Sequence, residues 1–375
     1  MKHAHWIMLT GEYPPQVGGV ADYTQQVASA LVQAGDVVEI WAPPCPGSAA
    51  IDQGVQVHRL PDHFGHDSLR LLNRRLRKPD PQRIIMVQYV PHAFGCRAMN
   101  VAFCAWLLSL RRQRIWTMFH EVAFSFARNQ SLRHRLLACV THWMAFIVAR
   151  ASSRVFISTP AWQRKVTRMC RRGTPIRWMA IPSNVPPAEA VVPPNKVPVI
   201  AHFGAYNLQD SHLGEEISSI LQADATVQMW LLGRGGEALA EELTAAHPEF
   251  RDRLLATGSL PAEQVAQRLV GADVIFQPYP DGVTTRRSSV MAALRLGRPI
   301  VTTRGPRTEP LWQQSGAVEL VDAGDITELQ RRTIGLLRDS QRRAELSQRA
   351  RRLYDDHFDL RHTIAALHEA VEAIP

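Results

Sequence analysis

The sequence has few cysteines, no long apolar run and no motif that is typical of nucleic-acid binding. Its 375 residues include five cysteines, an odd number without a Cys-x-x-Cys pair, so neither a disulfide framework nor a zinc site is indicated. The apolar segments 99–110 and 136–149 are shorter than the roughly 20 residues that a bilayer span requires. Zinc-finger, helix-turn-helix and RNA-binding signatures are missing, and so is a signal peptide. We expect a cytoplasmic protein that binds no nucleic acid.

Positive charge is present in excess. The chain has 43 Lys and Arg against 34 Asp and Glu, a formal net charge of +9. Such a charge suits nucleic acid, an anionic membrane surface or an anionic substrate, and composition does not choose among them. Most of it is interpreted as solvated helix surface. The clusters at 70–78 and 111–114, together with Trp106, Trp116 and Trp143, also suit peripheral contact with anionic lipid at the inner face of a membrane.

Short apolar runs alternate with amphipathic helical stretches in both halves of the chain. The predicted strands are 5–10, 37–42, 55–60, 84–90, 115–119, 154–158, 176–181, 199–204, 227–233, 254–258, 273–278 and 299–303. This alternation predicts α/β domains with mainly parallel sheets and helices on both faces. The proline-rich segment 186–198 cannot continue a central strand or helix, so it is interpreted as a linker. The predicted domains are therefore 1–185 and 199–355, followed by a C-terminal helix within 356–375 that packs back.

A polar loop with a glycine pair joins the first predicted strand to the first predicted helix. Gly18 and Gly19 allow a ligand to approach the backbone N–H groups at the start of a helix, where phosphate is favoured. A simple tight turn is the alternative interpretation. Tyr13 and Tyr23, on either side of the pair, are candidate contacts for an acceptor hydroxyl.

Polar residues follow two predicted strands of the first half. His120 and Glu121 come directly after the strand at 115–119, and Gln88 and Tyr89 end the strand before it in the chain. In parallel sheets ligands bind beyond the carboxyl ends of the strands. This predicts that His120 and Glu121 are catalytic and that Gln88 and Tyr89 line the acceptor wall. A structural histidine and core aromatic residues are the alternative.

Several stretches, in this order along the chain, together resemble the group 4 retaining glycosyltransferases. They are GEYPPQVGGVADYTQQVASALVQAGDVVEIWAP, FHE, IPSNVP, FGAYN, LLGRGGE and ADVIFQPYPDGV followed by AALRLGRPIVTT. The resemblance implies the GT-B architecture, an α/β fold with two Rossmann-like, doubly wound parallel-sheet domains that face a cleft. It also implies transfer of a sugar from a nucleotide-sugar donor to an acceptor hydroxyl with retention. The nucleotide would lie on the C-terminal domain and the acceptor mainly on the N-terminal one.

The resemblance further implies that the reaction needs no metal or other cofactor, and the sequence has no Asp-x-Asp motif. The basic and aromatic N-terminal half suits a glycan or lipid-linked acceptor, as in the synthesis of cell-surface polysaccharide or glycolipid. His120 would position or polarise a hydroxyl of the acceptor or of the sugar.

The chain departs from this family at the donor site. Members usually carry a glutamate, seven residues and a second glutamate, and counting back from Gly297 and Pro299 places these acids at Thr284 and Ala292. The basic pair that usually follows the first C-terminal strand is also missing from 204–214. The sequence is therefore interpreted as a variant subset that lacks the Glu-x7-Glu pair.

A basic loop stands where the acids are missing. Arg286 and Arg287, followed by Ser288 and Ser289, lie just before and at the start of a predicted helix. Guanidinium groups, hydroxyls and the N–H groups of a helix N-terminus all bind phosphate, so this loop is predicted to hold the donor diphosphate. A serine N-cap beside solvated arginines is the alternative.

Three further residues are candidate donor contacts. Gly204 and Asn207 follow the first C-terminal strand, and Arg234 follows the next.

Other functions remain open on the sequence alone, because architecture does not fix activity. The chain could be a non-retaining or donor-switched relative. It could be a non-catalytic binding or scaffold subunit of a polysaccharide-assembly complex. It could also be an enzyme that resembles the sugar-nucleotide epimerases.

Overall fold

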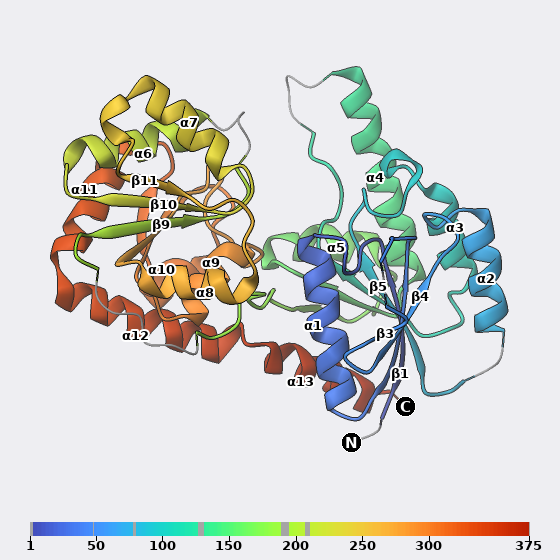
Figure 1. The fold of residues 1–375 in the computed structure, drawn as a ribbon. Helices are drawn as coiled ribbons and strands as arrows, with labels where there is room; N and C mark the ends of the chain where they lie inside the picture. The colour runs from blue at the N-terminus through green and yellow to red at the C-terminus, as the bar shows by residue number, and fades with distance from the viewer. Residues whose placement is uncertain are drawn as a thin grey trace. The chain divides into compact units, whose positions relative to one another are not determined.

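Two β-sheets organise the chain (Figure 1). The structure is a computed structural model that describes residues 3–47, 49–77, 80–126, 131–188, 195–206 and 211–374. Contacts divide it into unit 1, Met1–Ala180 with Leu360–Pro375, and unit 2, Ile181–Asp359.

In unit 1 the sheet has the strand order β3-β4-β2-β1-β5-β6-β7-β8 within the described residues. All neighbours are parallel except β3 and β4. The strands are β1 (His5–Thr10), β2 (Val37–Ala42), β3 (Ile51–Asp52), β4 (Val55–Arg59), β5 (Arg83–Tyr89), β6 (Ile115–Phe119), β7 (Arg154–Ile157) and β8 (Ile176–Trp178). Since the chain runs outward from β1 in both directions, the sheet is doubly wound, and its switch point lies beside β1.

The helices of unit 1 cover this sheet. They are α1 (Gly19–Gln33), α2 (His66–Leu76), α3 (Val101–Ser109), α4 (Leu132–Ala151), α5 (Gln163–Met169) and the C-terminal α13 (Leu360–Glu372), with short 3₁₀ turns at Cys96–Ala98 and Pro160–Trp162. Although α13 is last in the chain, it packs against α1 (Figure 1). Asp36 holds it there, because its carboxylate accepts from the His368 Nε2–H at 2.9 Å and from the Trp6 indole N–H at 2.9 Å.

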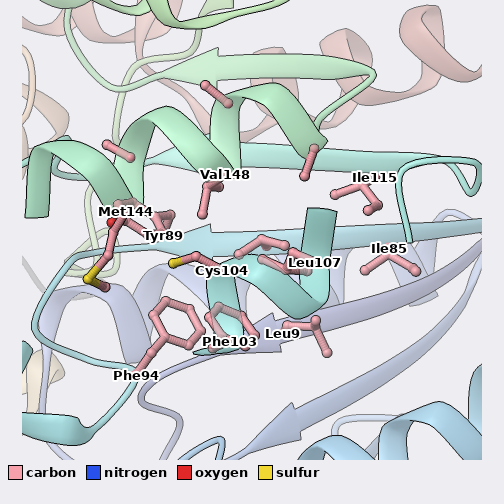
Figure 2. Close-up of a cluster of buried hydrophobic side chains, with 14 of the residues drawn as sticks. Leu9, Ile85, Tyr89, Phe94, Phe103, Cys104, Leu107, Ile115, Met144 and Val148 are labelled. Carbon is pink, nitrogen blue, oxygen red and sulfur yellow. The ribbon is translucent and has the colours of Figure 1, made fainter. Parts of the chain in front are cut away.

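The main core of unit 1 lies between the sheet and the helices α3 and α4 (Figure 2). Leu9 and Ile85 point from the strands toward Phe103 of α3 and Val148 of α4, and all four are fully buried. The rings of Phe94 and Phe103 stack with centroids 4.4 Å apart. Each such side chain contributes about 1.5–3 kcal/mol on burial. This packing fixes the carboxyl ends of β5 and β6, where the polar strand-end residues begin.

Unit 2 has a six-stranded parallel sheet within the described residues, in the order β11-β10-β9-β12-β13-β14. Its strands are β9 (Val199–Phe203), β10 (Gln228–Leu232), β11 (Leu254–Ala256), β12 (Val274–Gln277), β13 (Ile300–Arg304) and β14 (Glu319–Asp322). Its helices are α6 (Ser211–Ala223), α7 (Gly236–Ala246), α8 (Ala262–Gly271), α9 (Ser288–Arg295), α10 (Pro310–Ser315), α11 (Ile326–Arg338) and α12 (Ser340–His357), with a 3₁₀ turn at Pro248–Phe250. Ile200, Met229 and Phe276 from the strands bury against Ile217 and Leu336 of the helices.

The amphipathic pattern of the sequence also predicts a helix near 97–110, and this prediction is wrong in its first turn. Cys96, Arg97 and Ala98 have positive φ angles, and α3 begins only at Val101. Asn100 causes the break, because its Oδ1 accepts from the Phe103 N–H at 3.0 Å while its Nδ2 donates to two backbone carbonyls. A buried asparagine with these partners caps a helix and cannot lie inside one.

Candidate functional site

The start of α1 already holds a carboxylate. Glu12 lies in the loop after β1, and its Oε1 accepts from the backbone N–H groups of Val20 at 2.9 Å and Ala21 at 3.1 Å. A Cβ at Gly18 would come within 2.4 Å of this oxygen, whereas one at Gly19 would meet nothing within 4 Å. The helix N-terminus favours negative charge, so Glu12 occupies the position at which a phosphate would bind. The sequence reasoning missed Glu12, and the glycine pair's role in binding the donor stays a prediction.

The side chain of Tyr13 points into unit 1. It is 1% exposed, and its hydroxyl donates to the Asp52 carboxylate at 2.9 Å, which also accepts from the Gln25 side-chain amide at 2.8 Å. Burial and the adjacent Asp52 carboxylate raise the pKa of Tyr13 well above its ordinary value. The hydroxyl therefore ties the loop after β1 to β3, and its predicted contact with an acceptor would compete with this bond.

His120 and Gln88 meet where β6 and β5 end, as expected for adjacent parallel strands. His120 Nε2 lies 2.8 Å from Gln88 Oε1, and both side chains are buried. An amide oxygen only accepts, so Nε2 carries the proton and Nδ1 is left as an acceptor. Burial lowers the pKa of His120 to about 3. The imidazole is therefore neutral at physiological pH and fixed in one tautomer.

Two residues in contact with His120 carry buried polar atoms that lack a hydrogen-bond partner among the described residues. They are the hydroxyl of Tyr23, whose ring packs edge-on against the imidazole at 4.7 Å, and Nε2 of Gln88. Buried polar groups are satisfied in most proteins, and exceptions gather at functional sites. His120, Gln88 and Tyr23 are thus three predicted site residues that the fold brings together.

The other two strand-end residues of unit 1 lie differently. Tyr89 is fully buried and packs between Phe94 and Phe119, so it belongs to the core. Its hydroxyl has no partner within the described ranges. Glu121 is half-exposed, and one of its carboxylate oxygens lies 3.9 Å from Nδ1 of the exposed His92.

In unit 2, two hydrogen bonds between His202 and Tyr206 fix the end of β9. The Tyr206 hydroxyl donates to the His202 carbonyl at 2.9 Å and accepts from His202 Nδ1 at 2.9 Å. Burial lowers the pKa of His202 to about 4. Gly204 lies in this turn, and a Cβ at Gly233 would come within 2.0 Å of its carbonyl oxygen. Arg234 has an exposed side chain beside the same turn, where its carbonyl accepts from the Tyr206 N–H. The predicted contact Asn207 lies outside the described residues.

The loop before α9 gathers arginines around one aspartate. Arg287 donates to the Asp281 carboxylate at 2.7 Å, and Arg307 approaches the other oxygen at 3.0 Å. The Arg287 guanidinium also lies over the ring of Tyr279, 4.5 Å from its centroid. Arg286 precedes Arg287 in the chain, so this loop and its neighbour carry three arginines around the Asp281 turn. Asp281 itself pairs with two of them.

The first turn of α9 is lined by hydroxyls. Arg287 is the N-cap residue and makes no side-chain cap, and Ser288 is the first helical residue. Ser289 Oγ accepts from the Gln277 amide at 3.0 Å and lies 2.8 Å from the Tyr279 hydroxyl. Thr284 has a buried Oγ1 without a partner in the described part of the chain, and Ala292 is fully buried. Neither position expected to be acidic carries a charge.

Glu309 is a second residue that the sequence reasoning missed. Its buried carboxylate accepts from the Thr285 backbone N–H at 3.1 Å, from the Thr285 hydroxyl at 2.9 Å and from the Trp312 indole at 2.9 Å. The glutamate thereby fixes the loop that carries Arg286. Glu309 and Thr285 are 24 residues apart, so local patterns could not predict their hydrogen bond. The one local signal near Glu309 is the adjacent Pro310, which starts α10.

The part of the chain that carries this loop is similar to a known family. Residues 197–339 match the family model for glycosyl transferases group 1. The match covers β9 through α11 and includes Gly204, Arg234 and the loop before α9. No curated protein sequence matches the chain significantly.

Solved structures of glycosyltransferases share the whole fold. Sucrose-phosphate synthase from Thermosynechococcus elongatus aligns with a TM-score of 0.73 and 15% identity over 99% of this chain and 100% of its own. HepE of Anabaena, in complex with UDP and glucose, aligns at 0.68 and 16% over 99% and 100%. WaaG, a glycosyltransferase involved in lipopolysaccharide biosynthesis, aligns at 0.65 and 13% over 98% and 99%.

These likenesses establish the fold. The chain has the GT-B architecture, with two Rossmann-like α/β units and a C-terminal helix that returns to unit 1, which confirms the predicted fold class. Together with the family match they support a glycosyltransferase function. Among the described residues no helix has the length and apolar character to cross a membrane.

Proposed function

We propose that this protein is a retaining group 4 glycosyltransferase of a variant subset without the Glu-x7-Glu pair. It transfers a sugar from a nucleotide-sugar donor to an acceptor hydroxyl and uses no metal. The observation that carries the proposal is the basic, hydroxyl-lined start of α9, which lies within the segment that matches glycosyl transferases group 1. HepE, which shares the fold, has been solved with UDP and with UDP-glucose.

The donor diphosphate binds at the loop before α9. Arg286 and Arg287 supply guanidinium groups, Ser288 supplies a hydroxyl, and the first N–H groups of α9 point toward the same anion. Asp281 neutralises only part of the local charge, because it is shared by Arg287 and Arg307. The remaining positive charge takes the place of the usual basic pair, and it leaves no need for the acids at Thr284 and Ala292.

The same groups stabilise the departing nucleotide. Retaining transfer passes through an oxocarbenium-like transition state in which negative charge grows on the leaving diphosphate. Preorganised cations and a helix N-terminus stabilise charge at that point without a protein nucleophile. The acceptor hydroxyl loses its proton to the leaving phosphate oxygen on the same face of the sugar.

His120 positions a hydroxyl of the acceptor or of the sugar. Its imidazole is neutral, and the bond from Nε2 to Gln88 leaves Nδ1 free of a proton, so it accepts a hydrogen bond from a hydroxyl. The hydroxyl of Tyr23 and Nε2 of Gln88 are further polar atoms beside the imidazole, and neither has a hydrogen-bond partner among the described residues. The acceptor class that we propose is a glycan or a lipid-linked sugar, as in polysaccharide or glycolipid synthesis.

Product analysis tests the proposal. The purified protein is incubated with a panel of nucleotide sugars and simple glycoside or lipid-linked acceptors, and the new anomeric bond is examined by NMR. A glycoside with the donor's anomeric configuration supports it, and an inverted product contradicts retention. Free nucleotide without glycoside would favour an epimerase-like reaction. Absence of both turnover and nucleotide binding would favour a scaffold protein.

A further inference from the structure

The chain's net positive charge comes from one stretch, whose basic residues all lie in unit 1. Between Glu121 and Glu189 the sequence has eleven Lys and Arg and no Asp or Glu. The rest of the chain has 32 basic and 34 acidic residues, so this stretch supplies more than the whole net charge of +9. A stretch without a carboxylate of its own attracts anions, and of its basic residues Arg177 pairs with Glu369 of α13.

Within this stretch, α4 exposes an apolar stripe. Leu132, Leu136, Cys139 and Trp143 follow one another at spacings of four, three and four residues, which places them on one face of the helix. Leu132 is 82% exposed, Leu136 60% and Trp143 65%, and Cys139 is also exposed. Phe126, which is 56% exposed, extends the stripe, because its ring lies 4.9 Å from that of His142 in α4.

The helix α4 packs into the core of unit 1 through its opposite face. Its buried residues Met144, Ala145 and Val148 enter the core of unit 1 together with α3. The exposed stripe therefore contributes nothing to that core. Large apolar side chains in a row on the surface of a monomer mark an interaction site.

Basic groups flank the stripe. Arg133 and Arg135 lie on either side of Leu132 and Leu136, and Arg150 lies at the far end of the helix, where it covers the Phe146 ring at 5.0 Å. Beside them Lys165 of α5 contacts His142 at 2.9 Å. Apolar side chains along one face with arginines at its borders are the pattern of a helix that lies in the interface of an anionic membrane. Leu132 and Leu136 have no ring to stack on bases, and the sequence has no nucleic-acid-binding motif, so a lipid surface fits this face better than nucleic acid does.

We propose that the exposed face of α4, formed by Phe126, Leu132, Leu136 and Trp143 with Arg133 and Arg135, docks on the surface of an anionic phospholipid bilayer. The apolar side chains enter the headgroup boundary and the arginines bind lipid phosphates. The surface belongs to unit 1 alone, so the proposal does not depend on the transfer reaction. It would bring a membrane-bound acceptor to the protein that carries the donor.

Flotation with lipid vesicles tests the proposal on the full chain. With about 30 mol% phosphatidylglycerol in phosphatidylcholine the protein should float with the vesicles, and with phosphatidylcholine alone its partitioning should fall at least about tenfold. Leu136→Ser/Trp143→Ser and Arg133→Glu/Arg135→Glu should each lower partitioning onto the anionic vesicles by at least about tenfold. Raising the salt from about 0.1 to 0.5 M should weaken the binding of the unaltered chain.

Matched controls change the same residue types elsewhere. Ile51→Ser/Leu255→Ser alters two exposed apolar residues, and Arg251→Glu/Arg352→Glu alters two exposed arginines of unit 2. Both should float like the unaltered protein, and circular dichroism should show that all variants fold. Absence of flotation, equal loss in the controls, or a stripe variant that changes oligomeric state but not vesicle binding would overturn the proposal.

Discussion

The N-termini of α1 in unit 1 and α9 in unit 2 differ in how they meet negative charge. Both helices follow a strand and a glycine-containing loop, the geometry in which phosphate binds in Rossmann-like units. At α1 the carboxylate of Glu12 accepts from two of the first N–H groups. At α9 the N-cap residue is Arg287, which makes no cap, and arginines and serines surround the turn.

The difference shows how one chain can use the same local geometry twice. The α1 terminus is satisfied by an internal anion, the carboxylate of Glu12. At α9 no side chain caps the helix start, and two arginines precede it. In the function proposed above, the donor would bind at α9 in unit 2, and His120 would contact a hydroxyl in unit 1.

The largest expected effect concerns His120. His120→Ala should lower the rate of transfer by about 10²–10³-fold, because it removes a positioned hydrogen-bond partner of a reacting or neighbouring hydroxyl. Nucleotide affinity should not change, since the proposed donor site is at α9. Steady-state kinetics and nucleotide titration check this, with His92→Ala, an exposed histidine of the same unit, as control. Equal loss of transfer and nucleotide binding would remove the assignment of roles to the two units.

The two units should also differ in their response to acid. Burial lowers the pKa of His120 to about 3 against 6.5 in the unfolded chain, so unfolded unit 1 binds a proton over that interval and folded unit 1 does not. The free energy of unfolding of unit 1 therefore falls as the pH is lowered from 6.5, by about 1.4 kcal/mol per pH unit for His120.

Unit 2 contains two groups whose titration has opposite effects on its free energy of unfolding. The pKa of His202 is lowered to about 4, which costs stability below pH 6.5, whereas burial and the nearby Glu215 raise the pKa of Glu216 to about 7, which gains stability as it protonates below pH 7. Their effects cancel between about pH 4.5 and 6.5. Hydrogen exchange at pH 5 and pH 7 should show the larger loss of protection in unit 1, and an equal loss in both units would contradict the prediction.

A smaller effect is expected from the hydroxyl that braces α9. Ser289→Ala leaves the buried Gln277 amide and Tyr279 hydroxyl short of a partner, which costs about 1–3 kcal/mol of stability. Ser288→Ala is the matched control and should keep the stability of the unaltered chain. Chemical unfolding of unit 2 checks both variants. Equal stability of the two would mean that Ser289 does not support the loop.

The smallest effect is expected at α1. Glu12→Ala removes the carboxylate from the helix start and should cost about 1 kcal/mol of stability, while nucleotide affinity stays the same. Thermal unfolding and nucleotide titration measure the two quantities. A gain in nucleotide affinity of tenfold or more would show that the α1 terminus is a donor site from which Glu12 excludes phosphate.

Local patterns predicted much of the fold and part of the site. The periodicity predicted both parallel sheets, and the order of strand ends correctly suggested that Gln88 and His120 lie together, because adjacent parallel strands end at one edge. The start of α9 at Ser288 followed from the local sequence as well.

Hydrogen bonds between residues far apart in the sequence could not be predicted from local patterns. Tyr13 bonds to Asp52, 39 residues away, and Glu309 bonds to Thr285, 24 residues away. Glu12 reaches Val20 across a loop whose path depends on the packing of β1 and α1. Such bonds depend on tertiary structure and not on periodicity, which is why the internal anion at α1 was missed.

Thermal stabilisation by UDP, GDP, ADP, TDP and their sugars tests the contrast between the two helix N-termini most directly. The panel is applied to the unaltered protein, to Arg286→Ala/Arg287→Ala and to Glu12→Ala, each compared with its own unliganded state. A nucleotide at a hundredfold over its dissociation constant adds about 2.7 kcal/mol of apparent stability. We predict that one nucleotide stabilises the unaltered protein and Glu12→Ala equally and does not stabilise the double arginine variant. Stabilisation that survives the loss of both arginines, or no stabilisation of any form, would contradict the donor site at α9.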